Sequence, residues 1–104
     1  MQTGSELKEI ALDRVERKHV RWIDIATDVV RDIAQDVDAF TTDRVEYELE
    51  VRGIEPPNEP RAFGALMLRA ARAGWVSKTD QVAPSVIPRN HRRPKSIWKS
   101  RLRA

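Results

Sequence analysis

The sequence predicts an α+β fold that is mostly α, and three observations lead to this class. Apolar residues recur at helical spacing over most of residues 5–73, and two short stretches near the C-terminus have an extended pattern. Glycine and proline separate these segments. With 104 residues, the chain holds one domain with a single modest core. We expect a charged helical extension over residues 1–20 and the domain itself over residues 21–104.

Residues 5–39 are predicted to be helical throughout. Ser5 is a suitable N-cap, and acidic residues follow it in the first turn. From Trp22 to Val37 the apolar residues step by four, three, four and four positions, which marks one buried face. The pattern leaves open whether this is one helix or two that meet near His19. A homodimer through the N-terminal helix is expected if its apolar stripe exceeds what the domain covers.

Two shorter helices are predicted next. The run Phe40-Thr41-Thr42-Asp43 has a threonine cap and an acid in the first turn, so a helix follows over residues 43–51. Gly53 ends this helix, and the prolines within residues 54–60 predict a turn. Residues 61–73 then carry apolar positions at i, i+3, i+4 and i+7, which predicts a third helix.

The C-terminal part is predicted to form a two-stranded hairpin. Residues 75–78 and 97–99 have extended patterns, and residues 79–96 between them contain three prolines and a basic run. The predicted order is therefore helix, short helix, turn, helix, strand, long basic loop, strand. This is the order of a winged helix-turn-helix domain, in which the third helix enters the DNA major groove and the loop contacts the backbone.

Charge is distributed very unevenly along the chain. Residues 1–60 contain eight Lys or Arg and fifteen Asp or Glu, whereas residues 61–104 contain eleven Lys or Arg and a single acid, Asp80. Clustered arginine and lysine neutralise phosphates, so the basic half indicates double-stranded DNA as the partner.

The third predicted helix supplies the first set of candidate DNA-binding residues. A helical wheel places Arg61, Ala65, Leu68 and Arg72 opposite the core stripe, with Arg69 beside them. Arg61, Arg69 and Arg72 are therefore expected in or beside the major groove, because the guanidinium fork can grip phosphate or read guanine. The alternative is an ordinary solvated helix face.

The basic loop supplies the second set. Its candidates for contact with DNA phosphates, sugars or bases are Arg89, Asn90, His91, Arg92, Arg93 and Lys95. For the four basic side chains the alternative is a flexible tail that binds any polyanion. For Asn90 and His91 the more common role is to stabilise a turn.

Sequence features of enzymes and metal proteins are lacking. The chain has no cysteine, and its two histidines, His19 and His91, lie far apart. It has no Gly-rich phosphate loop and no nucleophile elbow. We therefore expect no catalysis, no cofactor and no metal. The three tryptophans, Trp22, Trp75 and Trp98, are interpreted as packing residues rather than as base-stacking residues.

The acidic half requires a separate interpretation. Asp24, Asp28, Asp32 and Asp36 recur every four residues on one flank of the predicted helix. Such a series does not converge on one point, so a solvated helix face is favoured over a cation site. The other use of this flank is a docking surface for a basic protein partner.

Targeting signals are not evident. The longest apolar runs fall well short of the roughly 20 residues that span a membrane. The N-terminus, MQTGSELKEI, has neither the basic start nor the apolar stretch of a signal peptide. We expect a cytoplasmic protein without a membrane partner.

Several segments resemble one group of proteins. They are Phe40-Thr41-Thr42-Asp43-Arg44-Val45, Pro57 to Ala65, Ala70 to Val76, Pro84 to His91, and Ile97-Trp98. From Trp22 onward the chain resembles small winged-helix proteins encoded by phages and prophages of actinobacteria. The resemblance implies a DNA-binding accessory factor of replication, recombination or gene control in the bacterial host. The alternative function is a protein-interaction module that binds a host or phage protein through its acidic N-terminal helix.

Overall fold

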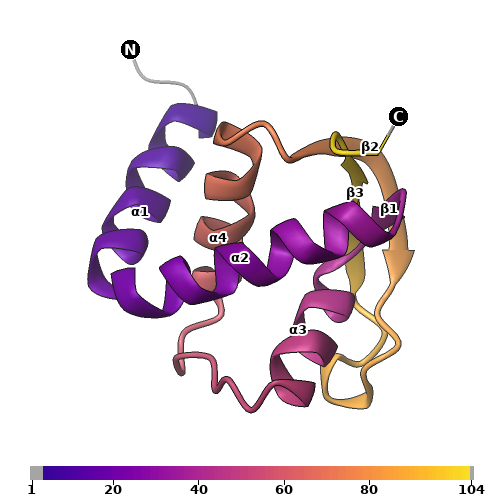
Figure 1. Ribbon diagram of the computed structural model, residues 1–104. Coiled ribbons are helices and arrows are strands. Elements are labelled where there is room, and N and C mark those ends of the chain that lie inside the picture. The colour runs from indigo at the N-terminus through magenta and orange to yellow at the C-terminus, as the bar shows by residue number, and fades with distance from the viewer. Residues whose placement is uncertain (1–3, 104) are drawn as a thin grey trace.

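The computed structural model describes residues 4–103, which form four α-helices and a three-stranded antiparallel sheet (Figure 1). The elements are α1 (Gly4–Lys18), α2 (Val20–Asp36), β1 (Ala39–Phe40), α3 (Thr42–Val51), α4 (Arg61–Arg72), β2 (Val76–Pro84), the 3-10 turn η1 (Pro88–Asn90) and β3 (Pro94–Ser100). The helices gather on one side and the sheet covers the other. The expected α+β class with a mostly helical content is confirmed.

The predicted helical region 5–39 is two helices, which meet at His19 at a steep angle (Figure 1). The His19 backbone (φ −119°, ψ 34°) departs from helical geometry, and its Nε2 lies 2.6 Å from Oε2 of Glu59, so the ring is held by the loop before α4. α1 begins at Gly4, and the side chain of Ser5, predicted to cap it, lies outside the described part of the structure.

The prediction of helix up to residue 39 was wrong. α2 ends at Asp36, and Ala39 and Phe40 form β1, which pairs with Lys99 and Trp98 of β3. Instead of continuing the helix, Ala39 and Phe40 pair with β3, a strand about sixty residues further along the chain. Local periodicity carries no information about such a partner.

The sheet has the order β1-β3-β2, so β3 is central and the described strands number three rather than the expected two. The strands are also longer than predicted, because residues 79–84 and 94–96 belong to them and not to the loop. Pro84 and Pro94 face each other in the last pair before the turn, where the ladder can end without a proline N–H.

The cap and the stop predicted for α3 are confirmed. The Thr41 hydroxyl accepts a hydrogen bond of 3.2 Å from the Asp43 amide at the start of α3. Gly53 and Gly74 follow the ends of α3 and α4 with φ of +71° and +83°, values that favour glycine.

Two groups of buried side chains hold the molecule together. The larger joins α2, α3, α4 and the sheet, with Val30, Val45 and Leu66 fully buried at its centre. The smaller consists of Val15 of α1, Ile23 of α2, and Ala62 and Ala65 of α4. α1 therefore packs along α4, and part of its apolar stripe is covered within the chain.

Candidate nucleic-acid interface

The outer side of α4 is partly covered by α1. Ala65, expected on the exposed face, is only 1% exposed, because it packs against Val15 and Ile23. A Cβ added at Gly64 would lie 3.2 Å from Cδ2 of Leu12, so the two helices are in close contact. The expectation that Ala65 faces outward was wrong.

Arg69 is engaged within the chain. Its guanidinium pairs with Asp24 of α2, and its Nε lies 3.8 Å from Oε1 of Glu16 of α1. The side chain thus joins α1, α2 and α4 at one point. Its role in this arrangement is structural, and contact with DNA would require these ion pairs to break.

Arg61 and Arg72 are exposed at opposite ends of α4. They are eleven positions apart along the helix, a rise of roughly 16 Å. Between them the outer face of α4 presents Gly64 and the half-buried Leu68.

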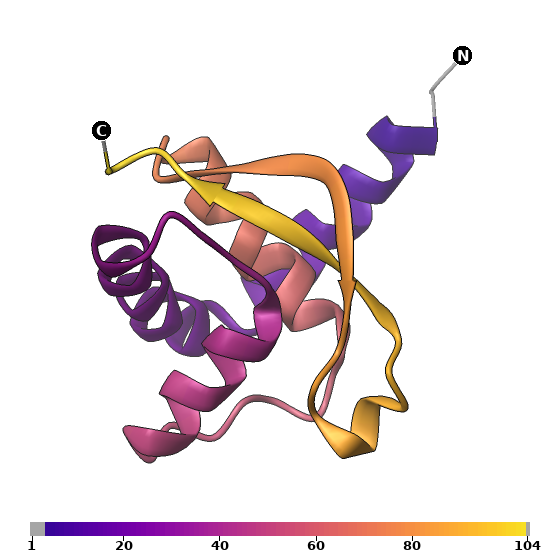
Figure 2. The ribbon, with the colours of Figure 1, turned by 90° about the vertical axis from the view of Figure 1, so that its right-hand side faces the viewer.

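A groove of about 500 Å³ runs between α1, α4 and the β2–β3 hairpin. Figure 2 shows the sheet in front of α4, with α1 behind it. Three lysines from three different elements line the groove: Lys8 of α1, Lys78 of β2 and Lys95 of β3. None of them forms an ion pair with another described residue, and Glu9 is the one acid in the lining. We call this feature the basic groove. Its remaining lining residues are Leu12, Thr42, Pro60, Phe63, Gly64, Met67, Leu68, Ser96 and Trp98.

Sequence reasoning identified Lys95 but missed Lys8 and Lys78. Lys8 stands four residues before Leu12, so the two share one face of α1. Lys78 pairs in register with Trp98, and directly paired strand residues share one face of a sheet. The first signal was readable from the sequence, and the second needed the strand register.

The hairpin loop (residues 85–93) is fixed to the start of α3. The buried Asp43 carboxylate accepts hydrogen bonds from the Ser85 hydroxyl and the Val86 amide, both at 2.8 Å. Asn90 donates from Nδ2 to the Ser85 hydroxyl at 3.2 Å. Asn90 thus takes the turn-stabilising role that was the alternative to DNA contact.

The basic residues of this loop differ in whether they form an ion pair within the chain. Arg89 pairs with Oε2 of Glu46 at 3.1 Å. Arg92 and Arg93 are exposed and form no ion pair with another described residue. His91 and Arg92 have positive φ values of 50° and 60°, so the chain turns sharply at the tip and projects both side chains outward.

The acidic residues of α2 are largely paired with arginines of the same chain. Besides the Asp24–Arg69 pair, Asp32 lies 3.0 Å from Arg52 and Asp36 lies 3.5 Å from Arg44. Asp28 is the member of the series without an ion pair among the described residues. Three of the four aspartates in this series therefore form ion pairs with arginines of the same chain. Within residues 4–103 no cluster of three potential metal ligands occurs.

The tryptophans pack as expected. Trp22 and Phe63 meet edge to face, with ring centroids 5.4 Å apart, and Trp98 packs against the larger core. The Arg31 guanidinium lies 5.4 Å from the Trp75 ring centroid, which is a cation–π contact.

The carboxyl of Glu59, in the loop before α4, has a lowered pKa. The hydrogen bond from His19 holds the pKa of Glu59 below its ordinary value of 4.5, and the Lys18 ammonium, 3.8 Å away, acts in the same direction. This pair joins the α1–α2 break to the segment that enters α4.

Comparison with protein-family models, with curated proteins and with solved structures finds no match to this chain. No helix within residues 4–103 has the length and apolar character needed to cross a membrane.

Proposed function

We propose that this chain is a non-catalytic double-stranded DNA-binding protein with a winged helix-turn-helix fold. The order α2, β1, α3, α4, β2, β3 and the sheet order β1-β3-β2 support this fold, with α4 in the place of the recognition helix and residues 85–93 as the wing. The resemblance to actinobacterial phage and prophage proteins supports a role as an accessory or regulatory factor.

The observation that carries the proposal is the set of lysines and arginines without acidic partners around α4. Lys8, Lys78 and Lys95 line the basic groove, and Arg92 and Arg93 project from the wing tip. Elsewhere in the molecule many arginines are matched by carboxylates, as in the Arg52–Asp32 pair. The cations without ion pairs in the groove and in the loop suit a polyphosphate backbone.

The contacts proposed with DNA divide into two kinds. The three groove lysines, Arg92 and Arg93 bind phosphates, and these contacts position the duplex without reading its sequence. Arg61 and Arg72, at the two ends of α4, are placed to reach base edges or the flanking backbone. Arg69 holds α1 in place instead.

The test is fluorescence anisotropy of a labelled duplex at several salt concentrations. Lys78→Ala with Lys95→Ala, and separately Arg92→Ala with Arg93→Ala, should weaken binding and flatten the log–log salt slope by roughly two units each. The matched control is Arg14→Ala with Arg17→Ala, which removes two exposed charges from the side of α1 opposite Lys8.

The control variant should bind like the unaltered protein. The proposal fails if both test variants keep their affinity and salt slope. It also fails if the control loses as much as they do, since binding would then depend on total charge and not on the groove and wing.

A protein-interaction module remains the second candidate, and one observation favours it. α1 occupies much of the α4 face that a recognition helix would present to DNA. Retention of a protein partner from nuclease-treated lysate, without a duplex shift at physiological salt, would support this alternative.

A further inference from the structure

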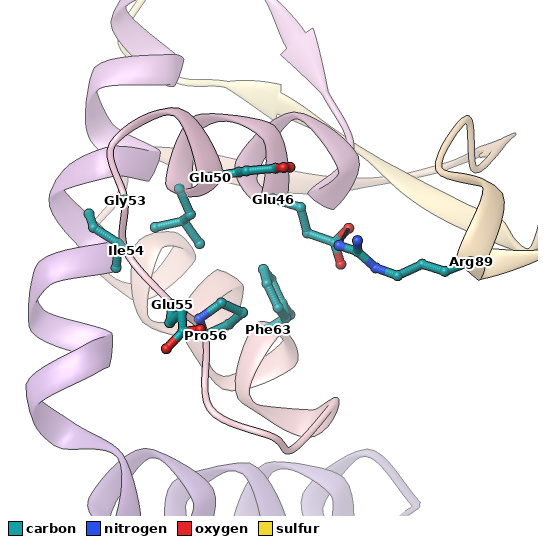
Figure 3. A pocket seen from close by; sticks show the side chains of 9 residues that line it. Glu46, Glu50, Gly53, Ile54, Glu55, Pro56, Phe63 and Arg89 are labelled. Atoms are coloured by element: carbon teal, nitrogen blue, oxygen red, sulfur yellow. Dashed lines mark hydrogen bonds and ion pairs between the residues drawn. The ribbon is translucent and has the colours of Figure 1, made fainter.

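A second concave region lies on the α3 side of the molecule, between α3, the turn that follows it and the start of α4 (Figure 3). It has a volume of about 470 Å³, and its apolar lining comes from Leu49, Ile54, Pro56 and Phe63. It shares only Phe63 with the lining of the basic groove. We call it the glutamate pocket, for the residues at its margin.

Three glutamates border the pocket. Glu46 and Glu50 extend from α3, and Glu55 belongs to the turn. Glu46 pairs with Arg89, the one basic residue of the lining. Glu50 and Glu55 are exposed and form no ion pair with another described residue. The margin is therefore negative, although the whole chain carries a net charge of +3.

α3 also carries two exposed large apolar side chains outside the pocket lining. Tyr47 and Val51 of α3 are 60% and 64% exposed, and they stand one turn apart on the helix that supplies Glu46 and Glu50. Neither residue is part of the pocket lining, so the apolar character of the pocket rests on Leu49, Ile54, Pro56 and Phe63.

We propose that the glutamate pocket binds a basic segment of a protein partner, with one apolar side chain of that segment in the pocket and lysines or arginines beside Glu50 and Glu55. The apolar lining favours a hydrocarbon side chain, and the unpaired carboxylates favour cations next to it. The same carboxylates repel phosphate, so DNA does not fit this surface. The proposal is thus independent of the DNA-binding proposal.

The probe is a fluorescein-labelled peptide with one leucine between two pairs of lysines, titrated with the full chain and followed by anisotropy. Glu50→Lys with Glu55→Lys should weaken its binding by about tenfold or more. The matched control is Asp28→Lys with Asp80→Lys, which changes the charge equally at exposed acids that do not line the pocket. Thermal melting of each variant checks that it is folded, as expected for exposed positions.

A second peptide, with serine in place of leucine, tests the apolar part of the site and should bind much more weakly. Equal loss in the two charge-reversal variants would overturn the proposal, because net charge alone would then explain binding. Equal binding of the leucine and serine peptides would overturn it as well. Lys78→Ala with Lys95→Ala should leave peptide binding unchanged, which separates this result from the duplex experiment.

Discussion

Asp43 links the hairpin loop to α3 through a single buried carboxylate. It is 8% exposed and accepts hydrogen bonds from Ser85 and Val86, while its own amide donates to the Thr41 cap. A short side chain at the start of a helix thus also fixes the position of a loop about forty residues away. These hydrogen bonds hold the hairpin loop in place against α3.

Asp43→Ala should lower the free energy of unfolding by about 1–3 kcal/mol, because the buried Ser85 hydroxyl and the Val86 amide lose their acceptor. Urea denaturation measures the loss, and hydrogen exchange at the Val86 amide should speed up. Asp80→Ala, at an exposed acid of β2, is the control and should change neither quantity. Unchanged protection at Val86 would show that Asp43 does not hold the loop.

Glu59 gives the stability of the protein a dependence on pH. Its pKa is lowered in the folded state, chiefly by the hydrogen bond from His19. A lowered pKa contributes stability above the ordinary value of 4.5, and this contribution is lost as pH falls through the folded-state pKa.

Glu59→Gln should therefore melt at a lower temperature than the unaltered protein at pH 6, and the difference should shrink as pH falls below 4.5. Thermal melts followed by circular dichroism between about pH 3 and pH 6 measure it. Melting curves that remain separated by the same interval over the whole range would contradict this assignment.

At the scale of elements, the contact between α1 and α4 sets the shape of the proposed interface. Leu12 packs onto Gly64, and Arg69 pairs with Glu16 and Asp24 beside it. α1 forms one wall of the basic groove, with Lys8 in its lining.

Gly64→Ala should stabilise the protein by roughly 0.5–1 kcal/mol. Alanine favours the helix interior over glycine by this amount, and the added methyl meets only the end of the Leu12 side chain, which can move. Chemical denaturation measures the change, with Leu12→Ala as a companion that should destabilise. A lower midpoint for Gly64→Ala would mean that α1 is rigidly fixed against α4.

The sequence predicted the elements whose signals are local. The bounds of α3 and α4 were correct to within one residue, because Thr41, Gly53 and Gly74 act on their immediate neighbours. β1 was missed because its two residues depend on hydrogen bonds with β3.

The candidate site was predictable only in part for the same reason. Arg92 and Arg93 lie in a loop where a basic run is itself the signal, and both are exposed as expected. Arg69 was placed on a DNA-facing surface, but Asp24, 45 positions earlier in the chain, pairs with it. Helical periodicity identifies the side of a helix that faces the core, but not which of its remaining residues another helix covers.

At the scale of the whole molecule, folding places many acidic and basic residues that are distant in the sequence next to each other. Acidic residues of α2 and α3 pair with arginines, and the cations without an ion pair among the described residues include Lys8, Lys78 and Lys95 in the basic groove and Arg92 and Arg93 in the hairpin loop. The acids left over include Glu50 and Glu55 at the other pocket. The molecule thus presents two surfaces of opposite sign.

Arg89 belongs to both surfaces. It lies in the hairpin loop, and it also lines the glutamate pocket, where it pairs with Glu46. It cannot pair fully with Glu46 and with a phosphate at the same time. Under the two proposals above, a cationic segment that pairs with Glu46 as well as with Glu50 and Glu55 would release Arg89 toward DNA and so raise affinity for the duplex. Thermodynamic reciprocity requires the duplex to raise affinity for that segment by the same factor. Under both proposals, this single ion pair would therefore make the two ligands positively cooperative.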